Sequence, residues 1–83
     1  MAYDPRELLR RLDSIQNMLY IALGSQYHRG HMLAQADKDL AQTIEQIAEG
    51  QALGTDATVT LLRNRLAETM RYRATVQMKM NGE

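Results

Sequence analysis

Apolar residues recur along this 83-residue chain at steps of three and four, which places them on one face of an α-helix. Three stretches show this pattern, at about residues 5–23, 31–49 and 56–80. No stretch shows the alternation of apolar and polar residues that is typical of strands. The sequence therefore predicts an all-α protein, a small antiparallel helical bundle in which residues 1–83 form a single helical domain.

The first helix has a strong start signal. Asp4 stands at the N-cap position, Pro5 at the first helical position, and Glu7 follows in the first turn, which is typical of a capping box. Gly24 is a plausible end. The apolar stripe predicted for this helix consists of Leu8, Leu12, Ile15, Leu19, Ala22 and Leu23.

The ends of the other two helices are marked in the same way. We expect Gly50 to end the second helix with a positive φ, Thr55 or Asp56 to cap the third, and Asn81 and Gly82 to end it. The connection between these helices is short, so we expect them to be antiparallel neighbours. Their predicted apolar stripes are Leu33, Ala36, Leu40, Ile44, Ile47 and Ala48, and Val59, Leu62, Leu66, Met70, Val76 and Met80.

Residues 24–30 leave two alternatives open. Gly24, Ser25 and Gly30 favour a connection between two helices. The heptad phase nevertheless continues across the segment, because Leu19, Gln26 and Leu33 are spaced by seven. A preserved phase is typical of one long helix over residues 5–49, in which each internal glycine would cost ~1 kcal/mol. The bundle therefore has three helices, or two if residues 5–49 are continuous.

The composition excludes several classes of protein. Cysteine is absent, so disulfides and thiolate metal sites are excluded, and the lack of Phe and Trp predicts an aliphatic core. A core this small favours self-association as an additional source of stability. The 10 basic and 10 acidic residues cancel, which argues against a general polyanion binder. With no apolar run of ~20 residues and no secretory signal pattern, we expect a soluble, cytoplasmic protein without membrane contacts.

The neutral total hides a segregation of charge. Residues 31–56 carry five acidic residues and one lysine, a net charge of −4, and residues 57–83 carry five basic and two acidic residues, a net charge of +3. This favours an acidic and a basic helix that attract each other and oppose wrong pairings. The alternative is a helix that binds a nucleotide or a nucleic acid. Against it, the arginines are spread around the predicted helix: Arg63, Arg65, Arg71 and Arg73.

Arg73 falls on the predicted buried face of the third helix. An unpaired guanidinium is costly to bury, so it needs a partner or a route to solvent. In an antiparallel arrangement, Arg73 lies within a turn of Asp37. We therefore predict a structural pair between Asp37 and Arg73 or a contact with another subunit. The alternative is that the Arg73 side chain extends into solvent.

The end of the first helix carries a candidate binding surface. Ile21 points away from the apolar stripe and Tyr20 lies beside it. Tyrosine and arginine are frequent anchors at protein interfaces, although single exposed apolar residues are also common on surfaces that bind nothing. The predicted protein-binding or oligomer interface consists of Tyr20, Ile21, Tyr27, His28, Arg29 and Arg73.

Catalytic, metal and cofactor sites have no support in the sequence. His28 and His31 supply at most half of a zinc site, since zinc takes three or four ligands. Asp37 and Asp39 point to different sides of a helix, so they cannot act as a catalytic pair. The chain has no glycine-rich phosphate loop. We expect no enzyme activity, no catalytic residues, no metal and no cofactor.

The eight-residue stretch AETMRYRA at residues 67–74 resembles the C-terminal helix of the proximal-rod proteins of the bacterial flagellum. The asparagine-rich N-terminal motif of those proteins is missing here. In size and helical-hairpin architecture the chain also looks like the small co-chaperones of type III secretion needle subunits. The compact size fits a bacterial or bacteriophage protein. Architecture alone does not establish function, so we expect a non-enzymatic protein-binding module, such as an adaptor, co-chaperone or inhibitor, that forms a homo-oligomer.

Overall fold

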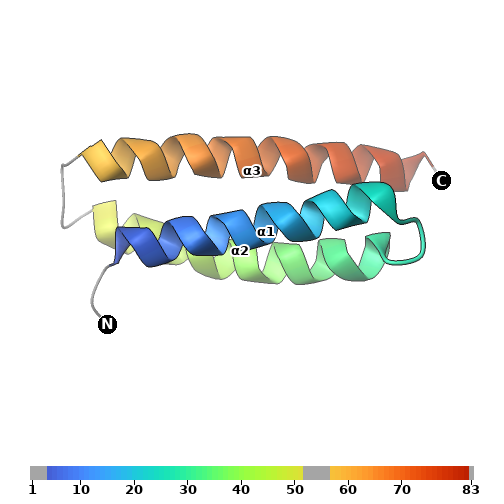
Figure 1. Cartoon of the computed structure of the whole chain (residues 1–83), viewed down its shortest axis with the longest axis horizontal. Coiled ribbons are helices and arrows are strands. Elements are labelled where there is room, and N and C mark those ends of the chain that lie inside the picture. The colour runs from blue at the N-terminus through green and yellow to red at the C-terminus, as the bar shows by residue number, and fades with distance from the viewer. Residues whose placement is uncertain (1–3, 52–56, 83) are drawn as a thin grey trace.

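The computed structural model describes residues 4–51 and 57–82, which fold into three α-helices and contain no strand (Figure 1). The helices are α1 (Pro5–Gly24), α2 (Arg29–Gln51) and α3 (Ala57–Asn81). As Figure 1 shows, α2 runs antiparallel to both α1 and α3, which run in the same direction. The predicted all-α bundle is confirmed, and its elongated form measures 43 × 21 × 16 Å.

The N-cap at the start of α1 is formed as predicted, whereas Glu7 pairs with arginines of its own helix and does not complete the capping box. Asp4 has an extended backbone, and its side chain accepts a hydrogen bond from the Arg6 backbone N–H at 3.1 Å. Pro5 occupies the first helical position, where its missing N–H has no intrahelical partner to lose. The Glu7 carboxylate lies 3.5 Å from Arg10 and 4.0 Å from Arg11, so it forms ion pairs along its own helix.

The chain reverses at residues 25–28, so the alternative of one helix over residues 5–49 is wrong. Ser25 adopts an extended backbone conformation directly after Gly24, and α2 begins at Arg29, two residues earlier than expected. A continuous helix would leave the apolar stripe of α1 without the stripe of α2 to pack against. The heptad phase reports the period within each helix and does not show whether the chain continues between them.

The expected helix ends agree only in part. The end of α3 at Asn81 is as predicted, and the Gly82 N–H donates to the Met78 carbonyl at 3.1 Å. Gly50, however, does not end α2, because the helix continues to Gln51 and no described glycine has a positive φ. The predicted caps Thr55 and Asp56 lie outside the described residues.

The core is aliphatic and centred on α1. Its largest contribution comes from α1, which packs against both other helices more extensively than α2 and α3 pack against each other. The helices α2 and α3 are antiparallel neighbours as expected, but their mutual contact is the least extensive of the three. The buried cluster consists of Leu8, Leu12, Ile15, Leu19, Ala22, Leu33, Ala36, Leu40, Ile47, Leu62 and Val76.

The predicted stripes of α2 and α3 need correction. Thr43 is buried where Ile44 and Ala48 were expected, and Thr69 is buried in place of Met70. Both threonines donate their hydroxyl to the carbonyl four residues earlier in their own helix, at 2.7 and 2.8 Å, so their polar groups are satisfied. Met80, also predicted to be buried, is exposed.

A polar contact joins α1 to α3 within this packing. Gln16 donates its side-chain amide to the Thr69 hydroxyl at 2.9 Å, and the same hydroxyl donates to the Arg65 carbonyl. Near it, Arg65 forms an ion pair with Asp13 at 2.8 Å. The interface between α1 and α3 is therefore fixed by specific hydrogen bonds as well as by apolar contacts.

Candidate interaction surface

Two cationic side chains hold the last turn of α1. Arg29 donates from Nε to the Ala22 carbonyl at 2.8 Å and from an Nη to the Leu23 carbonyl at 3.2 Å. Lys79, from the last turn of α3, also reaches the Leu23 carbonyl at 3.4 Å. The last carbonyls of a helix lack intrahelical partners and carry the negative end of its dipole, and α1 has no basic residue of its own there. All three helices therefore contribute to one fixed end of the bundle.

An aromatic contact lies beside this end. The rings of Tyr20 on α1 and Tyr72 on α3 are 6.2 Å apart between centroids and inclined at 53°, a geometry within the favourable range for aromatic pairs. Tyr72 is half-buried, whereas Tyr20 is 67% exposed. Tyr20 therefore rests against Tyr72 and still presents most of its surface to solvent.

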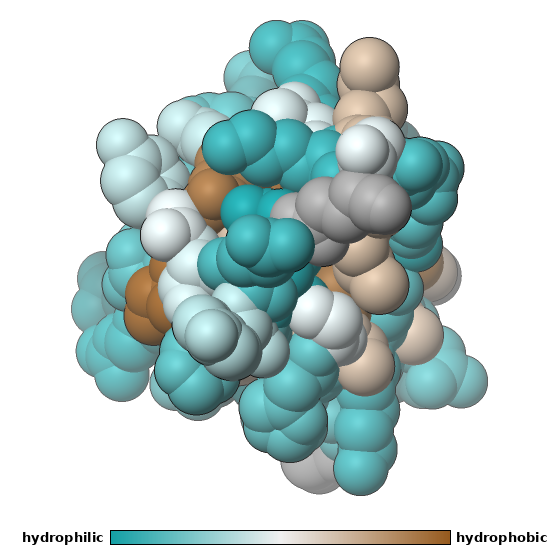
Figure 2. All heavy atoms as spheres, turned by 90° about the vertical axis from the view of Figure 1, so that its right-hand side faces the viewer, coloured by the Kyte–Doolittle hydropathy of each residue, from teal (hydrophilic) through white to brown (hydrophobic). Residues whose placement is uncertain are grey.

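Exposed large apolar side chains gather at the same end. Five of the eight such residues in the described chain lie on the last turns of α1 and α3 or on the connecting turn, so their distribution along the bundle is uneven. Figure 2 looks onto this end and shows hydrophilic atoms at its centre with apolar side chains at its sides. We define the turn-end surface as Tyr20, Ile21, Tyr27, Met78 and Met80.

The structure separates the residues of the predicted interface. Tyr20, Ile21 and Tyr27 lie together at the turn end, and Tyr27 is 96% exposed; His28 is also exposed there. Arg29 does not belong with them, because its side chain is buried and bound to the carbonyls of α1. Lys79 and Tyr72, which the sequence pattern did not indicate, contribute to the turn end instead.

Arg73 lies on α3 at a greater distance from the turn end, and it binds Asp37 of α2. Its Nε donates to one carboxylate oxygen at 2.7 Å and its Nη to the other at 3.0 Å, so the contact is bidentate. The hydrogen bond to Asp37 is the main cause that raises the pKa of Arg73, against a smaller opposing effect of burial. Because the pKa is raised, the stabilisation that Arg73 gains from this contact is fully present below the unfolded pKa of arginine, neutral pH included, and is lost only as the pH rises through the folded pKa of Arg73.

The coupling between Arg73 and Asp37 can be measured with a double-mutant cycle. We expect the variants Arg73→Met and Asp37→Asn to show a coupling of about 1 kcal/mol in chemical denaturation, since solvent screens a half-exposed pair. The same cycle on Arg10 and Glu7, whose side chains are more exposed, is the matched control and should give a smaller value. A coupling at Arg73 no larger than at Arg10 would show that the pair contributes no specific stabilisation.

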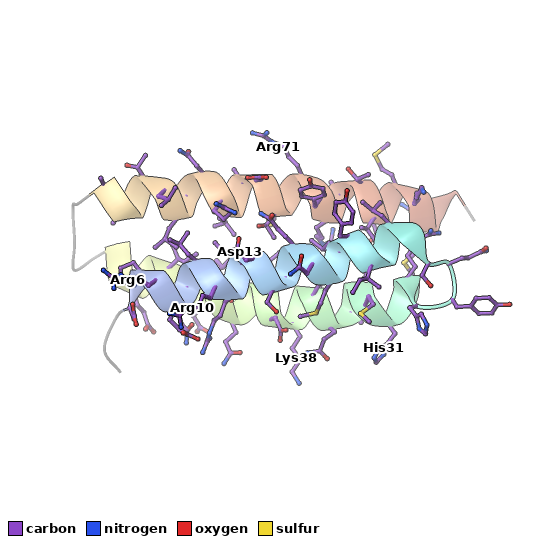
Figure 3. All side chains as sticks on the ribbon, in the orientation of Figure 1. Arg6, Arg10, Asp13, His31, Lys38 and Arg71 are labelled. Atoms are coloured by element: carbon purple, nitrogen blue, oxygen red, sulfur yellow. The ribbon has the colours of Figure 1, made fainter. Side chains whose placement is uncertain are left out.

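The basic residues of α3 do not form one surface. Arg65 and Arg73 engage carboxylates of α1 and α2, respectively. Arg71 projects outward from α3, away from the other helices (Figure 3). The opposite charges of α2 and α3 meet directly at the ion pair between Asp37 and Arg73.

The described residues contain no group of three or more histidine or acidic side chains that could hold a metal ion. Both histidines are exposed, and Figure 3 shows His31 on the outer side of α2. A depression lies between α1 and α2, away from the turn-end surface. It is lined by Arg11, Ser14, Ile15, Asp39, Gln42 and Thr43.

Within residues 4–51 and 57–82, no helix is long and apolar enough to cross a membrane. Comparison with known proteins gives no relative from which a function could be transferred. No protein-family model, no curated protein and no solved structure matches this chain.

Proposed function

We propose that this protein is a non-enzymatic protein-binding module, of the adaptor, co-chaperone or inhibitor type, that binds its partner through the turn-end surface and self-associates. The observation that carries the proposal is the concentration of exposed tyrosine, isoleucine and methionine at one end of the bundle. Tyrosine supplies a large contact area with few rotatable bonds, and methionine adapts to irregular surfaces. The chemistry of the turn-end surface therefore suits a protein partner.

The fixed position of the turn end supports this proposal. Arg29 and Lys79 tie the last turn of α1 to α2 and α3, and Tyr20 packs against Tyr72. A surface that is ordered before binding loses less conformational entropy when the partner docks. The contacts at this end thus order Tyr20 and its neighbours before a partner binds.

The proposal predicts that Ile21→Asp abolishes the capture of a partner. Ile21 is half-exposed and points away from the core of α1, so a charge there should leave the fold intact and make burial against a partner costly. The experiment is affinity purification from the native host with the full-length chain, followed by quantitative mass spectrometry. Proteins captured by the unmodified chain and lost by at least tenfold with Ile21→Asp would support the turn-end surface as the binding site.

Leu61→Asp is the matched control. Leu61 is 47% exposed, close to the value for Ile21, but lies near the start of α3, at the opposite end of the bundle. The Leu61→Asp variant should retain the captured proteins, and the Tyr27→Ala variant should lose them in part. Equal loss with Leu61→Asp and Ile21→Asp, or retention with both, would contradict the assignment to the turn end.

A further inference from the structure

A second apolar surface lies on the side of α2 and α3 that faces away from α1. Ile44 on α2 and Met70 on α3 are exposed there although both were expected in the core. Figure 2 shows apolar side chains along its right-hand side, from α3 above to α2 below. On α2 the exposed residues Ala34, Ala41 and Ala48 are spaced by seven and so share this side of the helix.

Charged residues flank the apolar side of α2 in a definite order. Lys38 and Glu45 are both exposed, are also spaced by seven, and form no ion pair with another described residue. They lie about 10 Å apart along the helix axis, too far to pair with each other. Figure 3 shows Lys38 projecting from α2 away from the other two helices, where a second molecule can reach it.

The α2 surfaces of two copies are complementary to each other when the two helices are antiparallel. If two copies of α2 pack antiparallel about a two-fold axis at Ala41, then Ala34 faces Ala48 of the second copy. In that arrangement Lys38 comes level, to within one residue, with Glu45 of the second copy, and the pair occurs twice. In a parallel arrangement Lys38 would come level with Lys38, and Glu45 with Glu45, so the opposite charges would not pair. A two-fold interface needs such a self-complementary surface, and charges flanking an apolar seam set its orientation.

We propose that a second copy of this chain occupies this surface, with the two α2 helices antiparallel and crossing at Ala41. The alanines let the two backbones approach closely, while Ile44 and Met70 of each copy border the contact. The α2 and α3 helices of the two copies together then form a four-helix core in which every neighbouring pair is antiparallel. This inference rests on the self-association part of the proposed function and is independent of what binds the turn-end surface.

Cysteine cross-linking tests the geometry, because the natural chain has no cysteine. Ala41→Cys should form a disulfide-linked dimer under mild oxidation, since the two-fold axis brings the two copies of position 41 together. Ala34→Cys alone should not, because its two copies would lie about 21 Å apart along the helices. An equimolar mixture of the Ala34→Cys and Ala48→Cys proteins should link to each other. A self-linked Ala34→Cys dimer would indicate parallel helices and overturn the proposal.

Charge reversal tests the complementarity. In sedimentation velocity over a range of concentrations, Lys38→Glu and Glu45→Lys should each raise the dimer Kd about tenfold, and the double variant should restore it. Circular dichroism checks that the fold is unchanged, as expected for exposed residues. A chain that is monomeric at all concentrations overturns the interface and the self-association, whereas the Ile21→Asp experiment still decides partner binding. If the dimer Kd is unchanged by both charge reversals and the Ala41→Cys variant does not cross-link, this interface is wrong, although the chain still self-associates.

Discussion

Leu12→Ala is expected to lower the free energy of unfolding by about 3 kcal/mol, the largest effect we predict for a single substitution. Leu12 has no solvent exposure and belongs to α1, the helix on which both other helices pack. The shortened side chain leaves a cavity that three helices would have to move to fill. For a domain of this size the loss is a large part of the total stability. Urea denaturation followed by circular dichroism measures it.

Leu61→Ala provides the comparison for this experiment. The same atoms are removed from a half-exposed position on α3, outside the buried cluster, so a loss below about 1 kcal/mol is expected. If Leu12→Ala and Leu61→Ala lost similar stability, the conclusion that the core is centred on α1 would be wrong.

Arg29→Ala should have the second-largest effect, a loss of about 2 kcal/mol. The substitution removes two hydrogen bonds to the last carbonyls of α1 and leaves those carbonyls without the partner that Arg29 supplied. It also removes a buried aliphatic stem. Thermal and urea unfolding of the variant measure the combined loss.

A second substitution separates the two contributions of Arg29. Arg29→Met keeps most of the stem and removes the donors, so it should lose about 1 kcal/mol. Arg71→Ala, on the outer side of α3, is the matched arginine control and should change little. If Arg29→Met were as stable as the natural protein, the carbonyl contacts would not contribute to stability.

The fold class and α1 could be predicted from local chemistry. The cap at Asp4 and Pro5 depends on a few neighbouring residues, and every predicted stripe residue of α1 is buried or half-buried because two helices cover that stripe. The stripes of α2 and α3 were less predictable. Most of each stripe is buried as predicted, but burial extends to the side of each helix that faces α1, where Thr43 and Thr69 lie, and Ile44 and Met70 stay exposed. Hydrophobicity alone favours Ile44 and Met70, since it does not count a hydroxyl satisfied within its own helix.

The candidate site was predictable where it depended on exposure and not where it depended on tertiary contact. Ile21 opposes the stripe of α1 in any helical projection, and it is exposed. Arg29 looks like a surface residue in sequence, because nothing local shows that its side chain turns back to the carbonyls of α1. The absence of any basic residue in the last turn of α1 was a usable signal, since that helix end needed a donor from elsewhere.

The hydrogen bond between Gln16 and Thr69 has a consequence for the uniqueness of the fold. A core of leucine, isoleucine, valine and alanine offers similar packing when one helix slides past another by a turn. If α3 moved by one turn, Gln16 would lose the Thr69 hydroxyl and Asp13 would lose Arg65. Such a displacement would leave the part-buried Gln16 amide without its partner, which costs free energy, and would break the exposed ion pair. The polar contacts thus fix the position of α3 along α1, and they select one alignment from several that the apolar residues alone would tolerate.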